Sequence, residues 1–226
     1  MKLPLQVVLV AALALLAGCV TGRRTLNLPA TAIDTPVPAV QGQVYIASVT
    51  DDRRFENKPP EPSTPSVDGD VAKLSPQQKN AMIGRQRNGY GHAMGDIALA
   101  DGDSVTQHTR LLVEQALGQQ GYKVVSDASA PNSMTVSVDQ FWSWMTPGFV
   151  ALSFEAQIQC RVTVTNRSGT KMVTIRGYAL NHGQFAKDEN WLEAFDPAFK
   201  DFIGNFGNTA SGLGLLADAP GSAGSR

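Results

Sequence analysis

Residues 150–165, VALSFEAQIQCRVTVT, alternate apolar and polar side chains along their whole length. Such alternation is typical of a β-strand that buries one face. Residues 134–144 and 172–180 show the same pattern, and turn-forming residues separate the three segments. We therefore predict antiparallel strands with one covered face. Cys160 falls on the apolar face, which favours a buried thiol that packs like a small hydrophobe over a redox or nucleophilic role.

Two helices are expected to cover this sheet. Ser104 to Gln107 matches a capping box, an apolar stripe follows at helical spacing, and Gly121 suits a left-handed C-cap. A second helix is predicted to begin at Asp196-Pro197 and to end at Gly207. A β-branched strand at residues 43–50 precedes the first helix. The sequence therefore predicts an α+β fold in the order β-α-β-β-β-α, with a mixed, mainly antiparallel four-stranded sheet and two helices on one face.

The N-terminus has the features of an export signal. Lys2 precedes an apolar stretch over residues 3–16, which ends in Leu16-Ala17-Gly18-Cys19. A charged start, a short apolar run and small residues are typical of a signal peptide, and the run is shorter than the about 20 residues of a spanning helix. The ending resembles the lipobox of bacterial lipoproteins. We expect a signal helix at 1–18 and palmitate-type lipidation of Cys19.

The lipid anchor predicts the location of the rest of the chain. Val20, rather than Asp, follows the lipidated Cys19, and by resemblance to the sorting rules of enteric-type bacteria this favours the outer membrane. We expect a tether at 19–41, a single α+β periplasmic domain at 42–207 and a disordered tail at 208–226. Residues 51–102 form a long insertion without clear periodicity, with a mobile Pro-rich first half and a Gly-rich second half that packs on the domain.

Composition and motifs favour a protein without enzymatic activity. The formal net charge is −1 and no basic stripe occurs, so no nucleic-acid partner is expected. The spacings of zinc, redox-dithiol, hydrolase and nucleotide-binding motifs do not occur in the sequence. We therefore predict no catalytic residues, no cofactor and no metal.

Two groups of residues are candidates for contact with a partner. Arg85, Arg87, Tyr90 and His92 lie in a Gly-rich stretch and are residue types favoured at contact surfaces. Alternatively, the glycines of this stretch let the backbone pack closely on the sheet. Trp142 and Trp144 either belong to the core beneath the helices or form an exposed tip that binds protein or lipid.

The chain resembles the YajG-type family of bacterial envelope lipoproteins. The resemblance rests on the Leu16-Ala17-Gly18-Cys19 box, the stretch from Leu112 to Tyr122, the strands from Met134 to Leu180 and the aromatic closing helix. It implies a small periplasm-facing lipoprotein without an established enzymatic activity. The expected role is non-enzymatic binding or structural support of an envelope protein partner. The alternative is an auxiliary in envelope lipid or lipopolysaccharide transport, with an apolar groove between sheet and helices.

Overall fold

The computed structural model describes residues 22–29, 38–88, 90–148, 150–210 and 213. The predicted signal peptide, Cys19 and most of the predicted tail lie outside this part of the chain. Within it, no helix is long and apolar enough to cross a membrane.

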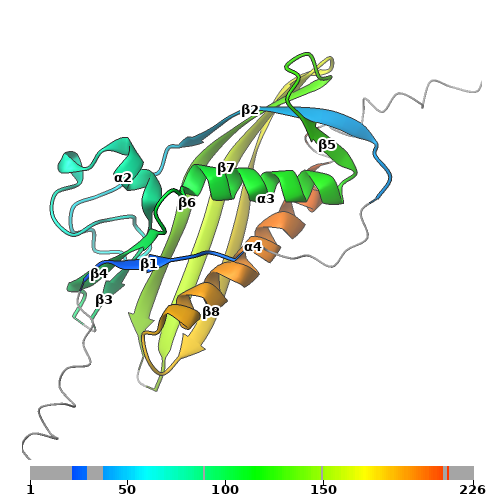
Figure 1. Ribbon diagram of the computed structural model, residues 1–226. Helices are drawn as coiled ribbons and strands as arrows, with labels where there is room; N and C mark the ends of the chain where they lie inside the picture. Colours follow the sequence, from blue (N-terminus) through cyan, green and yellow to red (C-terminus); the bar gives the residue numbers. More distant parts are fainter. Residues whose placement is uncertain (1–21, 30–37, 89, 149, 211–212, 214–226) are drawn as a thin grey trace, which may run out of the picture.

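Eight strands of the described chain form one mixed sheet (Figure 1). Strands β6, β7 and β8 are antiparallel neighbours, and β2 runs parallel to both β5 and β6. Strand β3 is antiparallel to β4 and parallel to β6, while β1 is parallel to β4. The strands are β1 (Arg24–Leu26), β2 (Gly42–Asp51), β3 (Met82–Arg87), β4 (Ala93–Leu99), β5 (Tyr122–Val125), β6 (Asn132–Pro147), β7 (Leu152–Asn166) and β8 (Gly169–Gly183).

The predicted four-stranded sheet with two helices is therefore wrong, although the α+β class is right. Two strands, β3 and β4, lie in the region expected to be an insertion, and register shifts at both ends of β3 interrupt its alternation. Strand β1 lies in the region expected to be a tether. Leu26 and Leu28 are buried there, and their burial holds β1 against β4.

The described residues also form three α-helices and a short 3-10 helix: η2 (Val71–Lys73), α2 (Pro76–Ala81), α3 (Val105–Gln119) and α4 (Asp188–Ala210). Helices α3 and α4 lie across the same face of the sheet (Figure 1). Helix α3 begins as predicted, because the Ser104 hydroxyl accepts the Gln107 backbone N–H at 3.3 Å. Gly121 adopts the left-handed conformation expected after the helix, with φ of 79°.

Helix α4 begins at Asp188, eight residues before the predicted start, so Pro197 lies inside it. A proline in a helix costs roughly 3 kcal/mol. Burial of one large apolar side chain contributes about 1.5–3 kcal/mol, so a buried stripe on both sides of Pro197 outweighs that cost. This stripe comprises Trp191, Phe195, Phe199, Phe202 and Phe206.

Helix α4 also closes one edge of the sheet. The Tyr178 backbone N–H on β8 donates to the Asp201 carboxylate at 3.0 Å, and the Asn205 side chain donates to the Arg176 carbonyl at 2.9 Å. Gly177 lies between these contacts, where a Cβ atom would collide with the Ala198 carbonyl. The absence of a side chain at this position lets the helix reach the strand.

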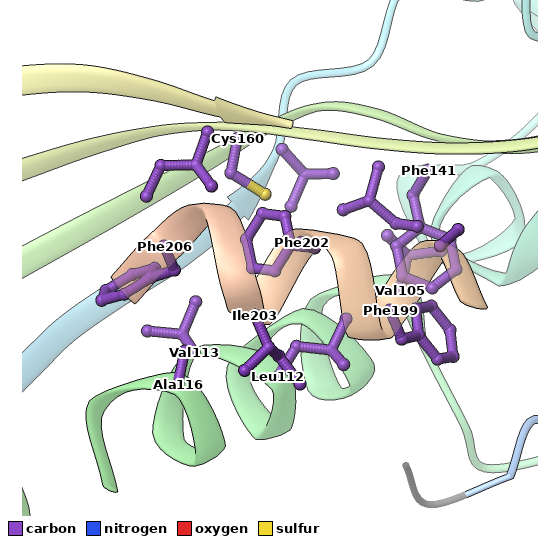
Figure 2. Packing of buried hydrophobic residues seen from close by; sticks show 14 of the residues in the cluster. Val105, Leu112, Val113, Ala116, Phe141, Cys160, Phe199, Phe202, Ile203 and Phe206 are labelled. Atoms are coloured by element: carbon purple, nitrogen blue, oxygen red, sulfur yellow. The ribbon is translucent and has the colours of Figure 1, made fainter. Parts of the chain in front are cut away.

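Side chains fill the space between the sheet and the two helices (Figure 2). Phe141 of β6 contacts the rings of Phe195 and Phe199, with centroids 5.5 and 5.7 Å apart. Cys160 is fully buried in this cluster, and burial raises the pKa of its thiol far above the usual range. The core interpretation of Cys160 is confirmed.

A β-bulge between Val138 and Gln140 gives the sheet a second core on its opposite face. The extra residue reverses the alternation, so Phe141 stays on the helix face while Trp142 and Trp144 face away from it. Both tryptophans are buried beneath residues 55–74 rather than beneath the helices. The cluster comprises Val67, Met82, Ala98, Trp142 and Trp144, flanked by Phe55, Val71 and Leu74.

Arg53 fills the gap where β6 changes partner from β2 to β3. Its guanidinium donates to the carbonyls of Met82 at 2.6 Å and Phe141 at 2.8 Å. It also donates to both carboxylate oxygens of Asp51, at 2.7 and 2.8 Å. These contacts connect β3 and β6 at the gap. The residues that follow Arg53 then cross the second face of the sheet.

Candidate functional site

A cavity of about 350 Å³ lies between residues 58–69 and the hairpin that joins β3 to β4. We call it the hairpin cavity. Three cationic side chains and one carboxylate line it, together with a hydroxyl and an imidazole. These polar lining residues are Lys58, Ser66, Asp68, Arg85, Arg87 and His92.

Arg85 lies opposite Asp96 in the β3–β4 ladder. Its Nη2 is 3.3 Å from Asp68 Oδ1, and its Nε is 3.6 Å from Asp96 Oδ1. The Asp96 carboxylate also accepts the Asp68 backbone N–H on both oxygens at 3.0 Å. Burial raises the pKa of Asp96 although these contacts act in the opposite direction. Asp96 thus links strands β3 and β4 to the segment that contains Asp68.

Arg87 is 6 % exposed and has a different environment. Its Nη1 donates to the Pro59 carbonyl at 2.7 Å, and its Nη2 donates to Ser66 Oγ at 3.4 Å. Within the described chain it forms no ion pair with a carboxylate. Burial, and then the neighbouring Arg85 cation, lower the pKa of Arg87, while the Glu61 carboxylate acts in the opposite direction. Its charge is therefore only partly compensated.

The structure separates the predicted contact residues into two groups. Arg85, Arg87 and His92 line the hairpin cavity, whereas Tyr90 is 90 % exposed at the hairpin tip. The Asn88 side chain shapes this tip by accepting the backbone N–H groups of Tyr90 and His92, both at 3.0 Å. The tip thus carries an exposed aromatic residue that directly precedes the cavity-lining Gly91 in the chain.

Trp142 and Trp144 do not line the cavity. Their indole N–H groups donate to the Pro62 carbonyl at 3.3 Å and to Glu155 Oε1 at 3.1 Å. These partners leave both rings buried on the second face of the sheet. The alternative of an exposed tryptophan tip is therefore wrong.

Sequence reasoning missed Lys58, Ser66 and Asp68 as lining residues. They belong to the Pro-rich segment that was expected to be mobile, and the contacts of Pro59, Ser66 and Asp68 with β3 join residues 17–28 positions apart. No motif marks such contacts. The only available signal was the pair of arginines at positions 85 and 87, because buried cations require partners from elsewhere in the fold.

The arrangement of the hairpin cavity suits binding. A guanidinium donates hydrogen bonds, accepts none and stays protonated, so Arg85 and Arg87 can hold acceptor groups. Among the residues that the structure describes, no group of three or more His, Cys, Asp or Glu side chains could hold a metal ion. In the described part of the chain, core side chains occupy the space between sheet and helices in which the lipid-transport alternative requires an apolar groove.

Comparison with known proteins supports the lipoprotein resemblance. The sequence profile of a family described as "Uncharacterized lipoprotein" matches residues 91–202. No curated protein matches the sequence.

Solved structures show weaker similarity. A protein of a family of unknown function from Xanthomonas campestris is 12% identical with a TM-score of 0.41, over 87% of this chain and 94% of that one. A hypothetical protein from Chlamydia trachomatis is 9% identical with a TM-score of 0.37, over 78% of this chain and 98% of that one. Similarity this low carries no functional information.

Proposed function

Because the chain belongs, through residues 91–202, to a family of uncharacterized lipoproteins, we propose that it is a non-enzymatic accessory lipoprotein of the bacterial envelope. Lipid on Cys19 anchors it in the outer membrane, and its domain faces the periplasm. There it binds another envelope component through the β3–β4 hairpin and the hairpin cavity.

One observation carries this proposal: the same hairpin carries an exposed aromatic residue and lines a polar cavity with buried cations. Tyr90 is 90 % exposed, while Arg85 and Arg87 are each 6 % exposed. Aromatic residues and arginines are enriched where proteins bind each other, and they supply much of the binding energy. The hairpin therefore combines an accessible contact residue with a charged recess that gives specificity.

Site-specific photocrosslinking in living cells tests this function. A photoreactive residue at position 90 should yield a discrete crosslinked product with an envelope component. The same residue at Leu111, which is 58 % exposed on α3, is the matched control and should yield none. Equal background at both positions, together with an intact envelope in a deletion strain, would contradict the proposed role.

The anchor is tested separately by metabolic labelling with palmitate. Wild-type protein should carry label and sediment with outer-membrane vesicles. Cys19→Ala protein should carry no label and lose that sedimentation, since the thiol that accepts the lipid is absent. Label on the variant would rule out Cys19 as the anchor, and label without outer-membrane sedimentation would contradict the location alone.

A further inference from the structure

We infer that the hairpin cavity binds a phosphate group, held by Arg87 with support from Arg85 and Lys58. This ligand class deepens the proposed function, on which it rests, because the recognised component would carry a phosphate.

The charge of the cavity lining points to an anion. Lys58, Arg85 and Arg87 are cationic, and Asp68 is the carboxylate among the lining residues. The Asp68 side chain is 88% exposed, so water weakens its pairing with Arg85. The chain as a whole has a formal net charge of −1. The lining thus holds three cations to one carboxylate, and a second carboxylate, Asp96, lies 3.6 Å from Arg85 Nε.

Arg87 makes the strongest case for a missing anionic partner. Its guanidinium is buried and donates to two neutral oxygens, those of Pro59 and Ser66. A buried charge is costly unless it is paired with an opposite charge. Arg85 beside it has a buried Nε without a hydrogen-bond partner among the described residues. An oxyanion in the cavity would give Arg87 the charged partner that it lacks within the described chain, whereas Arg85 already pairs with Asp68 and Asp96.

The donors in the cavity suit phosphate in particular. A guanidinium presents a planar fork of N–H groups that matches the oxygens of a phosphate, and a lysine adds a mobile point charge. Ser66 Oγ accepts from Arg87, which leaves its own proton free to donate. The cavity volume of about 350 Å³ accommodates a phosphorylated headgroup. Guanidinium, hydroxyl and ammonium donors thus surround one space.

Calorimetric titration of the full-length protein in neutral detergent tests this inference. The probes are inorganic phosphate, glycerol phosphate and dihexanoyl phosphatidylglycerol, a water-soluble lipid. Wild-type protein should bind at least one of them, and Arg87→Gln should weaken that binding at least about tenfold. The control is Arg167→Gln, which removes an equal charge from the exposed β7–β8 turn and should leave the affinity unchanged.

The probes separate the two sources of phosphate. Tighter binding of the lipid than of glycerol phosphate identifies a lipid headgroup, whereas equal or weaker binding identifies a soluble phosphate compound. Absence of binding to all three probes, or equal affinity in Arg87→Gln, overturns the inference. If circular dichroism shows that Arg87→Gln is unfolded, the exposed rim variant Lys58→Gln replaces it, and an unchanged affinity there has the same meaning. A crosslinked product from position 90 without phosphate binding would leave the proposed function intact and remove this ligand class alone.

Discussion

Replacement of Arg53 by Met should destabilise the fold far more than its position in a polar stretch suggests. The methionine keeps the apolar stem but removes donors to the Met82 and Phe141 carbonyls and to the Asp51 carboxylate. Loss of one partner from a buried ion pair costs about 3–5 kcal/mol, and each orphaned buried carbonyl costs about 1–3 kcal/mol. Because these costs overlap and local water relieves part of them, we expect a loss of about 4 kcal/mol. Proteins of this size unfold with roughly 5–15 kcal/mol, so the variant would be marginal.

The matched control is the neighbouring residue Arg54, whose side chain is 87% exposed and pairs with Glu56 at 3.3 Å. Arg54→Met should change the free energy of unfolding by less than about 0.5 kcal/mol. Urea unfolding followed by tryptophan fluorescence measures both variants, since Trp142 lies in the cluster that Arg53 borders. Addition of Asp51→Asn to Arg53→Met should recover part of the loss, because the unpaired carboxylate is removed. A loss below about 1 kcal/mol for Arg53→Met would refute this account of the gap in the sheet.

Three further substitutions test other features. Asp96→Asn should be more stable than wild type near neutral pH, and the difference in free energy of unfolding should shrink as the pH falls through the raised pKa of Asp96. The reason is that protonation relieves the cost of its buried charge in wild type; a difference independent of pH would contradict this. Gly177→Ala should lower the melting temperature by several degrees because its Cβ collides with α4, whereas Gly204→Ala, with open space around its Cβ, should not; equal shifts would count against the close approach. Cys160→Ser should cost about 1–3 kcal/mol in thermal unfolding by burying an unpaired hydroxyl, and an unchanged stability would argue against a dry core at this position.

Prediction from sequence succeeded where a strand buries a single face. The alternation in residues 150–165 runs through β7 without interruption, and its neighbours β6 and β8 were placed beside it correctly. It failed where a bulge changes the phase. The extra residue after Val138 moves Trp142 to the opposite face from Phe141, and period-two reasoning from Val136 assigns it to the wrong core.

The candidate site was predictable only in part for a related reason. Arg85 and Arg87 are recognisable by residue type, but their partners come from a proline-rich segment with no regular pattern. The Arg87 contact with Pro59 spans 28 residues. Such contacts depend on how residues 55–74 cover the second core, which in turn depends on the bulge and on Arg53. Local patterns carry no information about this arrangement.

The contacts between α4 and β8 also limit how the protein can assemble. An edge strand with free backbone groups is a template for another strand, and polymers can grow from it. Asp201 and Asn205 occupy the backbone groups of Tyr178 and Arg176, at the middle of a strand of 15 residues. A second chain therefore cannot extend the sheet continuously along β8. Helix α4 thus acts as a built-in cap for the β8 edge, whereas β1 and β5 end the described sheet on its other path.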